Sequence, residues 1–155
     1  ADPGAIVEVC PAAIAIVDAL ARRLVADGGA VLIIDYGHVG GGVGETLQAV
    51  RRHVYADVLE APGDADLTAH VDFAAVAQAA GDTGAMIYGP VAQGEFLRSL
   101  GIETRAATLA AGATEEQAAD IETALKRLTD AGAMGELFKV MALTAPGQSP
   151  PPGFS

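Results

Sequence analysis

The pattern of apolar and polar positions changes its period twice within the first 38 residues. After Pro11, apolar residues recur at three- and four-residue spacing from Ala12 to Ala26, which is typical of a helix with one buried face. A glycine pair, Gly28-Gly29, ends this helix, and five consecutive apolar residues, Ala30 to Ile34, follow. Such an unbroken run predicts a central parallel strand with helices on both faces. The sequence therefore indicates an α/β fold.

The middle of the chain shows shorter elements separated by turn residues. Weak strand signals lie at 46–50 and 67–71, as well as at 5–9 before the first helix. A glycine-rich loop is expected over 36–45 and a turn at Pro62-Gly63. Asp72 is suited to cap a helix over 73–80.

The last third of the chain is predicted to be mainly helical. A strand over 85–88 is expected to stop at Gly89-Pro90, and helices are expected over 91–100, 102–111 and 114–128. Gly101 separates the first two helices, and Thr114 with Gln117 forms a capping-box pattern before the third. A strand over 136–144 follows. We therefore expect one folded unit, residues 1–144, and a flexible Pro- and Gly-rich tail, residues 145–155.

Composition and charge narrow the class of partners. The chain has 155 residues, of which 51% are hydrophobic, and a net charge of −11. Such a surface repels a phosphate backbone, so nucleic acid is an unfavourable partner. No apolar run approaches the ~20 residues of a membrane span. The single Cys10 fits a reducing compartment, and its apolar neighbours predict a buried thiol.

The stretch GGAVLIIDYGH, residues 28–38, raises the question of a cofactor loop. A buried strand that ends in an acid and is followed by GGGVG, Gly40 to Gly44, is compatible with a dinucleotide- or S-adenosylmethionine-binding turn. However, Val39 interrupts the usual glycine spacing, and residues 46–55 lack a helical stripe. A nicotinamide-dependent oxidoreductase that binds its cofactor at Gly40 to Gly44 would need a helix directly after this loop, and the sequence shows none. A flexible surface loop is the other interpretation.

Six stretches together resemble one family, the MidA-type S-adenosylmethionine-dependent methyltransferases. They are AIVEVCPAA (5–13), LIIDYGH (32–38), ETLQAVRRH (45–53), ADLTAHVDF (65–73), GPVAQGEFLRSLGI (89–102) and GAMGELFKVMALT (132–144). The chain departs from the family pattern at Ala92, where a Thr is common, and at Val58, where a Pro is common.

The resemblance implies a fold and a function. The chain resembles the C-terminal portion of a Rossmann-like class I methyltransferase sheet with a helical insertion. LIIDYGH is then a later strand, and the residues that bind the cofactor are expected upstream of residue 1. The implied cofactor is S-adenosylmethionine. The implied activity is methylation of a protein arginine, linked to the assembly of respiratory complex I, with a complex I subunit as the implied substrate.

Candidate site residues follow from the elements on which they stand. Asp35, Tyr36 and His38 come just after a strand, where ligands of open α/β sheets bind, so we expect Asp35 and His38 to be catalytic and Tyr36 to bind the acceptor. Asp35 alternatively braces the loop. Acidic side chains suit a guanidinium acceptor.

A second group alternates along an extended segment. Period two places Asp66, Thr68, His70 and Asp72 on one face. We expect His70 to be catalytic and Asp66 and Thr68 to bind the substrate, together with Gln93 from the helix after Pro90. Arg51, Arg52 and His53 either bind an acidic partner or pair with Asp66. With its three histidines far apart, the chain has no expected metal site.

Alternatives remain at this point. A non-catalytic assembly module that lacks a cofactor loop fits the same residues. An apolar strand over 30–34 without its neighbours exposes an edge, which predicts self-association. The expected compartment is the cytoplasm of a bacterium, or the mitochondrial matrix if the source is eukaryotic.

Overall fold

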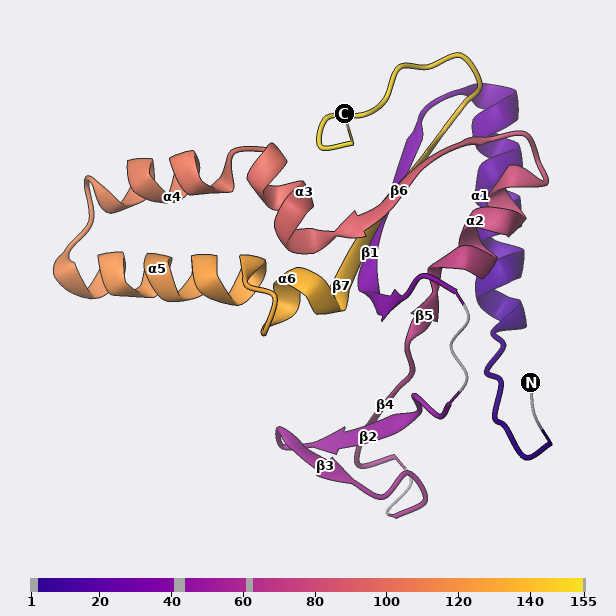
Figure 1. Ribbon diagram of the computed structural model, residues 1–155, viewed down its shortest axis with the longest axis horizontal. Coiled ribbons are helices and arrows are strands. Elements are labelled where there is room, and N and C mark those ends of the chain that lie inside the picture. Colours follow the sequence, from indigo (N-terminus) through magenta and orange to yellow (C-terminus); the bar gives the residue numbers. More distant parts are fainter. Residues whose placement is uncertain (1–2, 41–43, 61–62, 155) are drawn as a thin grey trace.

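The computed structural model describes residues 3–40, 44–60 and 63–154. Within these residues the chain forms α-helices and two β-sheets (Figure 1). The helices are α1 (Pro11–Asp27), α2 (Phe73–Gly81), α3 (Gln93–Ser99), α4 (Ile102–Ala110), α5 (Glu115–Thr129) and α6 (Met134–Leu137). The strands are β1 (Ala30–His38), β2 (Gln48–Arg51), β3 (Val54–Ala56), β4 (Asp66–Thr68), β5 (Val71–Asp72), β6 (Met86–Ala92) and β7 (Phe138–Thr144).

The larger sheet has the strand order β5-β1-β7-β6. β5 runs parallel to β1, whereas β7 runs antiparallel to both β1 and β6. β1, β5 and β6 therefore share one direction, and β7 is inserted between two of them. The β1–β7 register extends from Ala30 opposite Thr144 to Tyr36 opposite Phe138.

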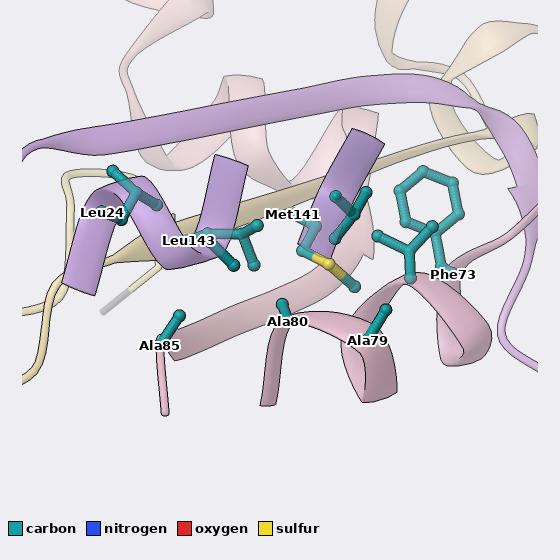
Figure 2. Close-up of a cluster of buried hydrophobic side chains, with 10 residues drawn as sticks. Leu24, Phe73, Ala79, Ala80, Ala85, Met141 and Leu143 are labelled. Atoms are coloured by element: carbon teal, nitrogen blue, oxygen red, sulfur yellow. The ribbon is translucent and has the colours of Figure 1, made fainter. Parts of the chain in front are cut away.

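The hydrophobic core lies between this sheet and the helices α1 and α2 (Figure 2). Phe73 at the start of α2 and Met141 and Leu143 of β7 are fully buried. The stripe predicted for the first helix is confirmed, because Leu24 and its helical neighbours on the same face pack into this core. Two helices thus cover one face of the sheet and set the position of the strand ends.

β1 differs from the predicted strand in length and in environment. It continues to His38 because β7 pairs with it as far as Tyr36 and β5 pairs with Gly37 and His38. The predicted loop therefore starts later than residue 36, and its residues 41–43 lie outside the described part. Leu32 is 53% exposed and Ile34 is 47% exposed, so the prediction of helices on both faces was wrong for β1.

Three further boundaries differ from those predicted. Residues 5–9 form no strand, because the carbonyl of Ile6 bonds to the amide of Gly44 instead of to a sheet. β6 does not stop at Gly89-Pro90 but passes through it with an irregularity between Tyr88 and Val91. Cys10 is exposed rather than buried, because it stands at the N-cap of α1.

The smaller sheet has the order β3-β2-β4 and projects below the main body in Figure 1. The weak strand signal at 46–50 is confirmed by β2. The extended segment 67–71 is broken, because β4 belongs to this sheet and β5 to the larger one. The turn between β2 and β3 places Arg52 and His53 at positive φ, 52° and 65°. Pro62 of the turn predicted at Pro62-Gly63 lies outside the described residues.

The helical insertion forms an arm of α4 and α5 that extends to the left in Figure 1, away from α1 and α2. The predicted capping box is confirmed: the Thr114 hydroxyl accepts from the Gln117 amide, and the Gln117 side chain accepts from the Thr114 amide. Gly101 precedes α4 at φ 83°. The final strand starts at Phe138 rather than 136, because residues 134–137 form α6.

The C-terminal segment folds back on the sheet. The ring of Phe154 lies 5.2 Å from that of Phe96 and 6.5 Å from that of Tyr88. The hydroxyl of Tyr88 also donates to the carbonyl of Gln148 over 3.0 Å. These contacts give the tail a defined place, and its predicted flexibility stays a prediction.

Candidate functional site

A cavity of about 880 Å³ opens where β1 and β5 end. Its walls come from the segment before α1, from the facing sides of α1 and α2, and from β5. Polar side chains in the walls include Glu8, His38, His70 and Asp72. The cavity lies at the carboxyl ends of two parallel strands, which is where open α/β sheets bind their ligands. Two predicted catalytic residues, His38 and His70, therefore come together here.

His38 is the last residue of β1 and stands opposite Asp72 in the parallel register. Its Nδ1 atom is buried and has no hydrogen-bond partner among the described residues. Buried polar atoms are almost always paired, so an unpaired one at a cavity wall needs an explanation. A bound group that donates or accepts a hydrogen bond at Nδ1 supplies one.

Aromatic rings fix the surroundings of His70. Its ring meets that of Tyr36 edge to face, with the ring centroids 5.7 Å apart. Tyr36 in turn packs edge to face against Phe138, at 5.5 Å. Such contacts are favourable and directional. Tyr36 therefore holds His70 from the side of the sheet.

Asp35 does not line the cavity. Its Oδ1 accepts from the following amide, that of Tyr36, over 2.8 Å, and its backbone stands opposite Lys139 of β7. The carboxylate braces the strand end, as the alternative interpretation of this residue expected. The structure gives no direct support to a catalytic role for Asp35.

The four alternating residues of 66–72 do not share one face. Asp72 caps α2 as predicted, accepting from the amides of Ala74 and Ala75 over 3.0 and 3.2 Å. His70 and Asp72 line the cavity. Asp66 and Thr68 belong to β4 in the other sheet, because the segment is broken at residues 69–70.

A second hollow, of about 740 Å³, contains Asp66 together with Asp64, Arg51 and Arg52. No ion pair within 4.0 Å joins these residues in the described part of the chain. The predicted pairing of these arginines with Asp66 is therefore not formed as a close contact.

Gln93 is separated from the other candidates. It is 7% exposed, and its Nε2 atom donates to the carbonyl of Leu128 over 2.9 Å. The amide thus joins α3 to α5 instead of facing the cavity. This placement supports a packing role for Gln93 in the helical arm.

Glu8 is the residue that the sequence interpretation missed. Its Oε1 accepts from the amides of Thr46 and Leu47 over 2.9 and 3.1 Å, and its Oε2 accepts from the Thr46 hydroxyl. These hydrogen bonds, chiefly those from Thr46, lower the pKa of the Glu8 carboxyl, and the nearby His70 lowers it further. A lone acid within the apolar stretch AIVEVC was the available signal.

The structure explains why residue 37, near the end of β1, is a glycine. A Cβ atom built there would lie 2.1 Å from the carbonyl oxygen of Val71. Glycine is needed at this position so that β5 can approach β1, which is a packing requirement rather than a cofactor cradle. Gly37 is thus explained by packing alone, and we assign no cofactor contact to the described residues.

The sheet and its cavity define an α/β protein with a candidate ligand site at the strand ends, and comparison with known proteins identifies its family. Residues 1–91 match the family described as "Putative S-adenosyl-L-methionine-dependent methyltransferase". The chain belongs to this methyltransferase family, as the resemblance predicted.

Several curated relatives share the name protein arginine methyltransferase NDUFAF7, mitochondrial. The relative from Danio rerio is 41% identical over 88% of this chain, and that from Homo sapiens is 38% identical over 88%. The Drosophila melanogaster homolog is 42% identical over 80%. The alignments cover 32%, 31% and 28% of the relatives, so the chain spans about a third of their length.

Two solved structures from Burkholderia thailandensis have the same fold. One has a TM-score of 0.81 and is 30% identical, and the matched region covers 95% of this chain and 40% of the solved chain. The other, bound to S-adenosyl-homocysteine, has a TM-score of 0.77 at 30% identity and covers 93% and 38%. The Rossmann-like fold class is thereby confirmed. Separately, no helix in the described residues has the length and apolar character of a membrane span.

Proposed function

We propose that this chain forms the acceptor-binding part of an S-adenosylmethionine-dependent protein arginine methyltransferase. The observation that carries the proposal is the cavity at the strand ends, which has His38 in its wall. The Nδ1 atom of this histidine is buried and has no hydrogen-bond partner among the described residues. The family of the chain and the name of its relatives support methyl transfer to arginine. The bound S-adenosyl-homocysteine of one structural neighbour supports the cofactor.

The chemistry requires a base and an oriented acceptor. S-adenosylmethionine supplies the methyl group when it is bound by residues that we expect upstream of this chain. A guanidinium that is methylated must lose a proton, and neutral imidazole is suited to take it near pH 7. His38 receives this proton at Nδ1, while His70, Tyr36 and Asp72 shape the acceptor side. The acidic surface of the chain favours a cationic acceptor.

The partners follow from the same proposal. The acceptor is a protein, and the family resemblance leads us to propose a subunit of respiratory complex I. The chain also associates with itself through β1, whose outer edge is paired only at Gly37 and His38 in the described residues. The compartment is the cytoplasm for a bacterial source and the mitochondrial matrix for a eukaryotic one.

The first test is methyl transfer by a polypeptide that joins this chain to the upstream part of the domain. Radiolabelled S-adenosylmethionine and an arginine-containing peptide are the substrates. His38→Gln should reduce turnover by about 100-fold, the range typical of losing a general base. His53→Gln, at the exposed turn of the small sheet, is the matched control and should leave turnover unchanged.

Two results would contradict the proposal. Turnover within twofold of wild type in His38→Gln would exclude this base, and label on a residue other than arginine would exclude the acceptor class. Calorimetric titration of S-adenosylmethionine into the 155-residue chain alone should give no heat. Clear binding by this chain would show that residues 35–44 include a cofactor loop.

A further inference from the structure

Glu8 joins three segments of the chain that line the cavity. Its carboxylate accepts three hydrogen bonds from Thr46 and Leu47, which lie in the segment before β2. The Thr46 hydroxyl oxygen also accepts from the amide of His70, over 2.9 Å. The position of Glu8 relative to His70 is therefore determined by a continuous set of hydrogen bonds.

The carboxylate of Glu8 keeps capacity for one more donor. An ionised carboxylate offers about four acceptor positions, and three are occupied here. The amides and the hydroxyl that bind Glu8 are neutral, so its negative charge is not compensated by them. Within the described residues, no Lys or Arg lies within 4.0 Å of this carboxylate.

The other carboxylates in the cavity wall belong to Asp18, Asp72 and Asp82, and each has a different place from that of Glu8. Asp18 pairs with Arg22 at 2.8 Å, and Asp72 caps α2. Asp82 stands at the other end of α2. The cavity walls contain no Lys or Arg in the described part of the chain. Glu8 thus lines the cavity with His70 and has no Lys or Arg partner among the described residues.

A guanidinium fits this set of groups better than an ammonium does. It carries five N–H donors in one plane, so it can donate to a carboxylate and to a second acceptor at once. His38 Nδ1 is such an acceptor in its neutral form, and it has no partner among the described residues. Glu8 and His38 both line the cavity, and each has acceptor capacity that no described residue fills, which suits a planar cation with several donors.

We propose that Glu8 is the carboxylate that anchors the guanidinium of the arginine acceptor, with Thr46 as the residue that positions it. This inference rests on the proposed function, because it takes the acceptor to be arginine. It adds a binding residue that lies before α1 and was not among the site residues predicted from the sequence. Charge-assisted hydrogen bonds to a fixed carboxylate give the site its preference for a cation.

Binding in the absence of S-adenosylmethionine tests this role separately from methyl transfer. The probe is a capped Gly-Arg-Gly tripeptide, added to the 155-residue chain while the imidazole signals of its three histidines are followed by NMR. The signals of His38 and His70 should shift and saturate, whereas that of His53 should not. Glu8→Gln should weaken binding by about tenfold, the loss expected for a charge-assisted hydrogen bond.

Matched variants and probes separate the anchor from a purely structural role. Thr46→Ser keeps the hydroxyl and should bind like wild type. Glu116→Gln, on the exposed first turn of α5 and outside the cavity, should change affinity by less than about twofold, since surface charges contribute little. A capped Gly-citrulline-Gly tripeptide, which is neutral, should not bind. Circular dichroism should show that each variant retains the fold.

The outcomes are distinct. Equal affinity in Glu8→Gln and wild type, binding of the citrulline peptide, or no binding by wild type would each overturn the role of Glu8. If the arginine peptide binds through Glu8 but the joined polypeptide transfers no methyl group, the anchor stands and the proposed methyltransferase activity fails. If methyl transfer occurs and Glu8→Gln changes neither binding nor KM, the proposed function stands and the anchor fails.

Discussion

Single residues in this protein act mainly through the hydrogen bonds that they provide to neighbouring backbone. Asp72 illustrates this, because its carboxylate satisfies two amides of the first turn of α2. The same residue closes the wall of the cavity. Helix capping and the shape of the site therefore depend on one side chain.

The cap predicts a measurable loss of stability. Asp72→Ala should lower the free energy of unfolding by about 1 kcal/mol, the usual value of an N-cap. Urea unfolding followed by circular dichroism measures this change. Asp82→Ala, at the other end of α2, is the control and should have little effect. Equal losses for the two variants would show that Asp72 does not act as a cap.

The hydrogen bonds to Glu8 predict a dependence of stability on pH. They lower its folded-state pKa below the ordinary value of 4.5. Glu8 therefore contributes stability above the unfolded-state pKa, and this contribution is lost as the pH falls through the folded-state pKa. The fall of stability with acid should be less steep in Glu8→Gln.

Unfolding by urea across pH 3 to 6 measures this effect, a window set on either side of the ordinary carboxyl pKa of 4.5. Glu116→Gln, on the exposed first turn of α5, is the matched control. Parallel pH profiles for wild type and Glu8→Gln would contradict the stabilising role of the ionised carboxylate.

At the scale of elements, the turn between β2 and β3 has a backbone conformation that its two residues rarely adopt. Arg52 and His53 both adopt positive φ, the conformation of a two-residue hairpin turn that favours Asn-Gly. A residue with a Cβ atom in this conformation raises the energy of the backbone. The small sheet is therefore less stable than the same hairpin would be with Asn-Gly at its turn.

Replacing both residues should stabilise the hairpin. Arg52→Asn with His53→Gly should raise the free energy of unfolding by about 1 kcal/mol, because Asn and Gly adopt left-handed conformations readily. Arg52→Ala with His53→Ala removes the same side chains but keeps both Cβ atoms, and should give no such gain. Thermal and urea unfolding of the two double variants compares them directly. Equal stability would refute the assignment of strain to this turn.

At the scale of the whole molecule, β1 presents an open edge and an apolar face. Leu32 and Ile34 are about half exposed, and they lie on the face opposite α1 and α2. Apolar strands with free edges pair readily with other chains. The net charge of −11 opposes such contact but is spread over the whole surface.

The resulting association should be sensitive to one substitution on β1. Wild-type chain should show concentration-dependent self-association in sedimentation velocity, and Ile34→Lys should shift it toward the monomer, because a charge on the contact strand must be desolvated. Leu109→Lys, which changes an equally exposed leucine on α4, should leave association unchanged. A wild-type chain that sediments as a monomer at every concentration would contradict self-association.

Local patterns by themselves determined much of this protein. The helix after Pro11, the caps at Asp72 and Thr114 and the break at Gly101 are specified by neighbouring residues, since helices and caps depend on contacts close in sequence. The family resemblance in short motifs likewise indicated the Rossmann-like class. The position of His38 at a strand end that faces a candidate site was predicted, but its place in one cavity with His70 was not.

Only the tertiary structure decided the rest, because it depends on pairing between segments far apart in the chain. The length of β1 is set by β7, more than a hundred residues later, and the division of 66–72 between two sheets is set by which strand each part meets. Gln93 faces Leu128 rather than the cavity for the same reason. Glu8 became visible as a site residue only when Thr46 and His70 were brought beside it, since hydrogen bonds between distant residues leave no local pattern in the sequence.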